Sequence, residues 1–113
     1  MRGRYLMTSV MPPGRNSVPE TRFRLTARVS SANLLGIRPV IERTLPGVLA
    51  RAEGDEIILE GEVRGGTAKE LNRSLLSALR RVEKRTRIRS EWTAEGGGVE
   101  RYFDYVLKAK SRP

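Results

Sequence analysis

The sequence contains neither cysteine nor histidine. Disulfides, thiol nucleophiles, the usual zinc sites and a histidine general base are therefore excluded. Carboxylates remain as catalytic candidates, and Glu91 and Asp104 are the pair that neighbouring strands could bring together. No pattern typical of a cleft accompanies them, so we interpret both as solvated surface carboxylates. We predict a protein that is not an enzyme and that uses no cofactor and no metal.

Long hydrophobic runs are also missing. No stretch approaches the roughly 18 consecutive apolar residues of a membrane-spanning helix, so we expect no membrane partner. The first 20 residues contain arginines but neither a clear apolar core nor a small-residue cleavage site, and they do not match a signal peptide. We expect a cytoplasmic location.

Positive charge is present in excess, with 22 Lys and Arg against 13 Asp and Glu and a net charge of +9. All 13 acidic residues lie between Glu20 and Asp104, where 16 basic residues leave a net charge of +3. Basic ends are typical of proteins that bind nucleic acid, although they also keep small proteins soluble. The other basic residues, outside this middle part, are Arg2, Arg4, Arg15, Lys108, Lys110 and Arg112.

Composition divides the chain into three parts. Residues 1–19 combine Pro, Gly, Asn and Ser without a hydrophobic period, and we interpret them as a disordered basic arm in which Met7 or Met11 is an alternative start. We predict a single α+β domain over residues 20–109 and a basic tail over residues 110–113. A chain of 113 residues is long enough for one core.

The first half of the domain shows a strand pattern followed by a helix pattern. Apolar residues alternate with basic and polar ones over Arg22–Val29, which predicts a half-buried strand. Ser30-Ser31 then offers N-cap hydroxyls to a helix, and Pro39 inside that helix predicts a kink or a split. The apolar residues of this helix, at spacings of three and four, are Leu34, Ile37, Ile41 and Leu45.

Two strands and a second helix are predicted next. Val48–Ala52 is a weak strand pattern and Glu56–Arg64 a stronger one, with a turn between them. Gly65-Gly66 ends the second strand, and Thr67 and Glu70 match a capping box that starts a helix. The predicted apolar stripe of this helix is Leu71, Leu75, Ala78, Leu79 and Val82.

Two strands complete the predicted fold, a first from Thr86 to Ala94 and a returning one from Glu100 to Ala109. The order β-α-β-β-α-β-β predicts an α+β, two-layer, ferredoxin-like split β-α-β fold, with a mostly antiparallel sheet and two helices on one face. Without a strand at Val48–Ala52 the order becomes β-α-β-α-β-β. That alternative is similar to the Alba family of archaeal nucleic-acid-binding proteins, whose last two strands form a projecting arm.

The first candidate site is the outer face of the second helix. Basic pairs four residues apart destabilise an isolated helix by about 0.2–0.5 kcal/mol each, so a face that keeps them is suited to phosphate. The helix dipole accounts for cations in the last turn, but not for Lys69 and Arg73. With the strand that follows and the terminal hairpin, the predicted nucleic-acid-binding residues are Lys69, Arg73, Arg80, Arg81, Lys84, Arg85, Arg87, Arg89 and Arg101.

Two further candidates are weaker. The segment Arg64–Lys69 leads through two glycines into a helix N-terminus, where free N–H groups can bind phosphate. It lacks the spacing of a P-loop, and we favour a plain turn. The terminal hairpin combines basic and aromatic residues, which can grip nucleic acid. However, Trp92 alternates in phase with Ile88 and is predicted to be core, as is one of Tyr102 and Tyr105, without an indication of which.

Charge is separated along the chain. Residues 53–62 contain five acids and no base, whereas residues 80–89 contain six bases and one acid. In the ferredoxin-like order the first strand lies beside Glu56–Arg64, so its arginines face Glu60 and Glu62 and the exposed sheet face is predicted to neutralise itself. That face also lacks the outward aromatics of an RNA-recognition sheet. The arginines are Arg22, Arg24 and Arg28.

These patterns favour a small non-catalytic module that binds RNA or DNA through phosphates, on the surface from Lys69 to Arg89. The alternative is a homo-oligomeric structural or scaffold protein, in which the acidic 53–62 patch of one copy contacts the basic 80–89 patch of another.

Overall fold

The computed structural model describes residues 20–111. The predicted arm over residues 1–19, with Met7 and Met11, lies outside the described residues, and so does Arg112. In chain order the elements are β2 (Thr21–Ser30), α1 (Leu34–Thr44), β3 (Val48–Glu53), β4 (Glu56–Gly65), α2 (Ala68–Val82), β5 (Arg87–Ala94), β6 (Val99–Phe103) and β7 (Val106–Ser111).

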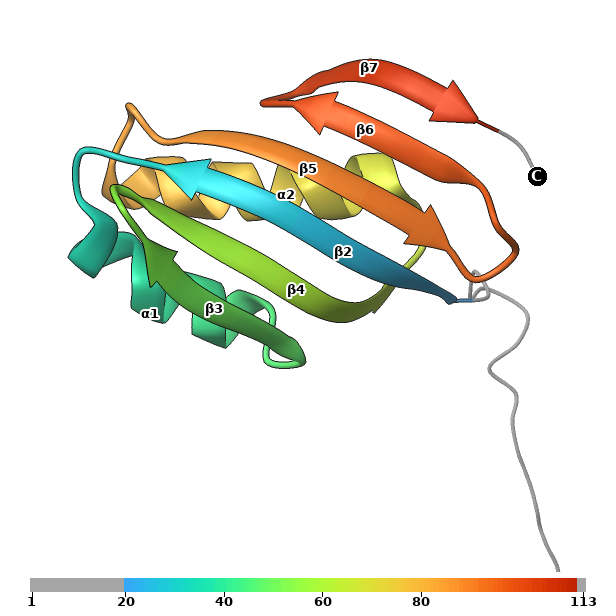
Figure 1. The fold of residues 1–113 in the computed structure, drawn as a ribbon, viewed down its shortest axis with the longest axis horizontal. Coiled ribbons are helices and arrows are strands. Elements are labelled where there is room, and N and C mark those ends of the chain that lie inside the picture. Colours follow the sequence, from blue (N-terminus) through green and yellow to red (C-terminus); the bar gives the residue numbers. More distant parts are fainter. Residues whose placement is uncertain (1–19, 112–113) are drawn as a thin grey trace, which may run out of the picture.

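The strands form one open sheet in the order β3-β4-β2-β5-β6-β7, and every neighbouring pair is antiparallel. Both helices lie on the same face of this sheet (Figure 1). The predicted α+β class is therefore confirmed. Neither helix lies behind β7, so this last strand is exposed along most of its length (Figure 1).

The strand order differs from the predicted ferredoxin-like order because β6 and β7 extend the sheet beyond β5. The predicted single strand from Glu100 to Ala109 is in fact two strands joined at Asp104 and Tyr105. Asp104 adopts a positive φ of 55°, a conformation that aspartate tolerates better than most residues. Strand β7 also continues through Lys110, which was predicted to lie in the tail.

The segment from Val48 to Glu53 does form a strand, β3, which pairs with β4 at one edge of the sheet. The alternative element order, similar to that of the Alba family, is therefore wrong. Helix α1 is capped by Asn33 rather than by Ser30 or Ser31, because the Asn33 side chain accepts a hydrogen bond from the Gly36 amide (2.9 Å). It remains one continuous helix of 11 residues despite Pro39.

The core lies between the helices and the inner face of the sheet. The predicted alternation of β2 is confirmed, since Phe23, Leu25, Ala27 and Val29 are all buried. Trp92 is fully buried, as predicted, and packs edge-on against Phe23. Tyr102 is the core tyrosine, whereas Tyr105 is 45% exposed.

The buried face of α2 differs from the predicted stripe, and Val82 and Leu76 show the difference most clearly. Val82, the last residue of the helix, is 42% exposed, and Leu76, which was not predicted, is fully buried. Leu76 lies one turn beyond Asn72, whose side chain bonds to β5 and to the turn between β6 and β7. The buried side of α2 therefore extends toward β6 and β7, the two strands that were predicted as one.

Candidate functional site

The nine predicted basic residues do not form one surface. In β5, Ile88, Ser90 and Trp92 are buried beneath the helices, so Arg87, Arg89 and Glu91 point away from them. We call the side of the sheet away from the helices the outer face. Arg89 and Arg101 lie on this outer face, whereas the predicted residues of α2 lie on the helix layer.

On α2 and the turn that follows it, the exposed basic residues without a carboxylate in ion-pair distance form what we call the helix surface. Three belong to α2 and the fourth follows its C-terminus. Within residues 20–111, none of the four makes an ion pair. They are Lys69, Arg73, Arg81 and Lys84.

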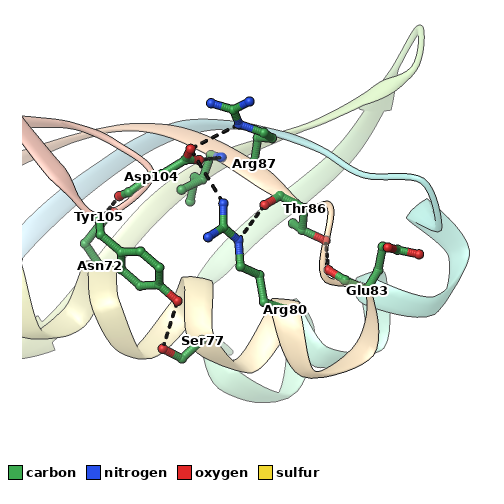
Figure 2. A network of polar contacts seen from close by, with 9 residues as sticks. Asn72, Ser77, Arg80, Glu83, Thr86, Arg87, Asp104 and Tyr105 are labelled. Carbon is green, nitrogen blue, oxygen red and sulfur yellow. Dashed lines mark hydrogen bonds and ion pairs between the residues drawn. The ribbon is translucent and has the colours of Figure 1, made fainter.

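Arg80 and Arg87 already have partners inside the protein (Figure 2). The Arg80 Nε donates to the Thr86 carbonyl (2.8 Å), and its Nη2 lies 3.5 Å from Asp104 Oδ2. The Arg87 Nε donates to the same Asp104 oxygen (3.0 Å), while the Ile88 amide donates to its other oxygen (3.0 Å). The guanidinium of Arg80 also stacks over the ring of Tyr105 (5.2 Å). These contacts hold the β6–β7 turn against α2 and β5, and they give each arginine a carboxylate partner within the protein.

Two more predicted residues are paired. Arg101 donates to Glu91 Oε2 (2.8 Å) on the neighbouring strand. Arg85 lies 3.5 Å from the carboxylate of Glu83, which also accepts a hydrogen bond from the Arg85 amide (3.1 Å). That backbone hydrogen bond is the main reason why the pKa of Glu83 is lowered. Neither Glu91 nor Asp104 stands free, because each binds arginine.

The glycine pair before α2 forms a plain turn. Thr67 Oγ1 accepts a hydrogen bond from the Glu70 amide (3.1 Å), as the capping pattern predicts. Gly65 lies against the side chain of Leu71, which would stand only 2.6 Å from an added Cβ. A glycine here thus permits close packing of β4 on α2.

The outer face is neutralised in part. As predicted, β2 lies beside β4, and Arg24 faces Glu62. The closest ion pair of this region joins Arg28 to Glu56 (3.0 Å), while Glu60 pairs with Arg51 of β3 (3.6 Å) rather than with an arginine of β2. Cross-strand pairing therefore accounts for most of the charge on β3 and β4.

Arg89 is one of the cations of this face that have no carboxylate partner. Its register partner on β2 is another cation, Arg28, and no carboxylate within residues 20–111 pairs with Arg89. On its other side lies Phe103 of β6, whose ring centroid is 5.5 Å from the guanidinium carbon. Sequence reasoning missed Phe103 because the run from Tyr102 to Leu107 was assigned to one strand. Alternation with the buried Tyr102 would have placed it on the outer face.

An open groove of about 570 Å³ runs across this part of the sheet. A second hollow of about 280 Å³ adjoins it and shares Arg28, Arg89 and Phe103. We call the larger one the outer groove. Its lining includes Thr26, Arg28, Arg89, Arg101, Phe103 and Lys108.

The described residues offer no group of three or more carboxylates that could hold a metal ion. None of their helices has the length and apolar character needed to cross a membrane. Burial and the hydrogen bond to Glu100 raise the pKa of Tyr102, so its hydroxyl stays the donor in that bond at neutral pH.

Comparisons with protein-family models, with curated proteins and with solved structures find no match to this chain.

Proposed function

We propose that this protein is a non-catalytic module that binds RNA or DNA through phosphate contacts made by the helix surface. The observation that carries the proposal is the set of four exposed cations, Lys69, Arg73, Arg81 and Lys84, which lack carboxylate partners among the described residues. When such cations neutralise phosphates, the nucleic acid releases its bound counterions, and this release drives binding. Phosphate contacts do not read bases, so we expect little sequence preference.

The basic charge outside the helix surface supports the same proposal. The chain has a net charge of +9, which attracts a polyanion over distances of about a Debye length. On the outer face, ion pairs neutralise several arginines, whereas all four cations of the helix surface lack an ion pair among the described residues. We also propose that β2, β3, β4 and β5 form a ferredoxin-like unit with the two helices, which β6 and β7 extend.

Fluorescence anisotropy with labelled single-stranded RNA, single-stranded DNA and duplex DNA tests the proposal at about 50 mM salt. The triple variant Lys69→Ala, Arg73→Ala and Lys84→Ala should lose affinity to a similar extent for all three probes. Its matched control removes three arginines outside α2 that also lack ion pairs, and it should lose much less affinity. The control substitutions are Arg22→Ala and Arg64→Ala on the outer face and Arg43→Ala on α1. If the wild-type protein binds none of the three probes, the proposal fails.

Self-association is a second candidate function, and the edge strand β7 favours it. This strand has an unpaired edge, and its Val106 and Leu107 are 56% and 44% exposed. Such edges pair readily with strands of other molecules. Internal ion pairs occupy several members of the acidic 53–62 and basic 80–89 patches, which weakens charge as the cause of association.

Light scattering at low and high salt separates these causes. Association through β7 should persist at high salt, and Leu107→Lys should abolish it. Association through the charged patches should instead weaken as salt rises. A monomer under all conditions would contradict this second candidate.

A further inference from the structure

Arg89 lies in a cluster of cations on the outer face and is the one without a counter-charge. Arg28 is directly opposite on β2, and Arg87 precedes it by two residues on the same face of β5. Arg28 is neutralised by Glu56 and Arg87 by Asp104. Among the described residues no carboxylate does the same for Arg89. Like charges directly opposite one another destabilise a sheet, and a bound anion would relieve that repulsion.

The Arg89 side chain is also held in place. The ring of Phe103 lies 5.5 Å from its guanidinium carbon, at the distance of a cation–π contact. The N–H edge of a guanidinium is the part that binds phosphate oxygens in pairs. Within residues 20–111 the Arg89 side chain donates no hydrogen bond that would occupy this edge.

The outer groove provides room for a ligand beside Arg89. Its volume of about 570 Å³ lies within the range of small-molecule sites, about 300–1,000 Å³. Lys108 of β7 lines the same groove and likewise lacks an ion pair among the described residues. Two unneutralised cations and one aromatic ring therefore border a space of suitable size.

We propose that the outer groove binds a phosphorylated ligand of mononucleotide size, with the phosphate on Arg89 and Lys108 and the base near Phe103. The ligand is either a free nucleotide or one nucleotide unit of a single strand, since both present the same phosphate and ring. This inference does not rest on the helix surface, which lies on the other side of the sheet.

Isothermal titration of the full chain with adenosine monophosphate, adenosine, inorganic phosphate and a short oligoadenylate tests the proposal. Adenosine monophosphate should bind one to one and more tightly than adenosine or phosphate alone. Arg89→Gln should weaken its binding at least about tenfold, as expected for loss of a charge-assisted hydrogen bond. Phe103→Leu should weaken the nucleotide more than inorganic phosphate.

Arg24→Gln is the matched control, because Arg24 of β2 carries the same charge on the same face of the sheet but does not line the outer groove. It should leave nucleotide binding unchanged. Arg89→Gln removes a repulsive neighbour of Arg28. The thermal stability of this variant should therefore equal or exceed that of the wild type. A loss of binding by this variant will then not reflect unfolding. Arg89→Lys should restore binding in part, since lysine keeps the charge but not the paired N–H groups.

The two sources of the ligand give different results. Oligoadenylate binding tighter than that of adenosine monophosphate, with the same loss in Arg89→Gln, identifies a single strand, whereas equal or weaker binding identifies a free nucleotide. The proposal is overturned if neither probe binds saturably, or if Arg24→Gln and Arg89→Gln lose affinity equally. The Lys69, Arg73 and Lys84 triple variant should keep adenosine monophosphate binding, so failure of the helix surface and failure of the groove are distinguishable.

Discussion

Asn72 joins three parts of the molecule that are far apart in the sequence. It is fully buried on α2, and its Nδ2 donates to the carbonyl of Asp104 (2.7 Å). Its Oδ1 accepts from the Ser90 hydroxyl (2.6 Å) and from the indole N–H of Trp92 (3.3 Å). A buried polar group of this kind is stable only when its hydrogen bonds are all made. Asn72 therefore fixes how α2 meets β5 and the β6–β7 turn.

We predict that Asn72→Ala lowers the free energy of unfolding by about 1–3 kcal/mol, because it leaves buried polar groups without partners. Urea unfolding measures this difference. Ser74→Ala, on the exposed side of the same helix, is the control and should change the free energy by less than about 0.5 kcal/mol. An Asn72→Ala protein as stable as the control would show that the network contributes little.

Sequence reasoning at the residue scale succeeded where alternation alone decides burial, as for Trp92. It failed for Asp104, which was interpreted as a solvated carboxylate. The Asp104 side chain binds Arg80 and Arg87 and is mostly buried. These partners are distant in sequence and meet Asp104 only through the β6–β7 turn, so no local pattern could reveal the pairing.

At the scale of elements, helix α2 was predictable because its cap and its hydrophobic period agree. The β6–β7 hairpin was not, because its two-residue turn, Asp104-Tyr105, contains no glycine or proline and its single aspartate is a weaker turn signal within an apolar and aromatic run. The positive φ of Asp104 is instead supported by its hydrogen bonds to Ile88. Tertiary contacts thus determine that β6 ends at Phe103, the residue that pairs with Arg89.

The C-terminal end of α2 should be sensitive to acid. Since the hydrogen bond from the Arg85 amide lowers the pKa of Glu83 in the folded protein, the fold favours the ionised carboxylate. Its contribution to stability is therefore present at neutral pH and is lost as the pH falls through the lowered pKa.

We predict that Glu83→Gln lowers the midpoint of urea unfolding at pH 7 and that the difference from wild type shrinks near about pH 3. The effect should be small, because the side chain lies at the surface. Arg85→Ala should have less effect than Glu83→Gln, because the Arg85 backbone amide remains. A Glu83→Gln difference that is the same at both pH values would contradict this account of the helix end.

At the scale of the whole molecule, the sheet divides the positive charge into two separate sites. The sequence predicted one basic surface from Lys69 to Arg89, because it could not show that Arg89 lies on the outer face. It also could not show which cations are neutralised, since ion pairs depend on strand register. Cations without an ion pair among the described residues lie on both sides of the sheet, and they include those of the helix surface and of the outer groove.

The salt dependence of polynucleotide affinity tests the central claim most directly. The slope of log K against log salt concentration measures the number of phosphates that the protein neutralises, at about 0.9 per phosphate for duplex DNA. We predict that the Lys69, Arg73 and Lys84 triple variant reduces the steepness of this slope by about 2.7 relative to wild type. The Arg22, Arg43 and Arg64 control should leave it nearly unchanged. An equal slope for the wild type and the Lys69, Arg73 and Lys84 variant would show that the helix surface does not contact phosphate.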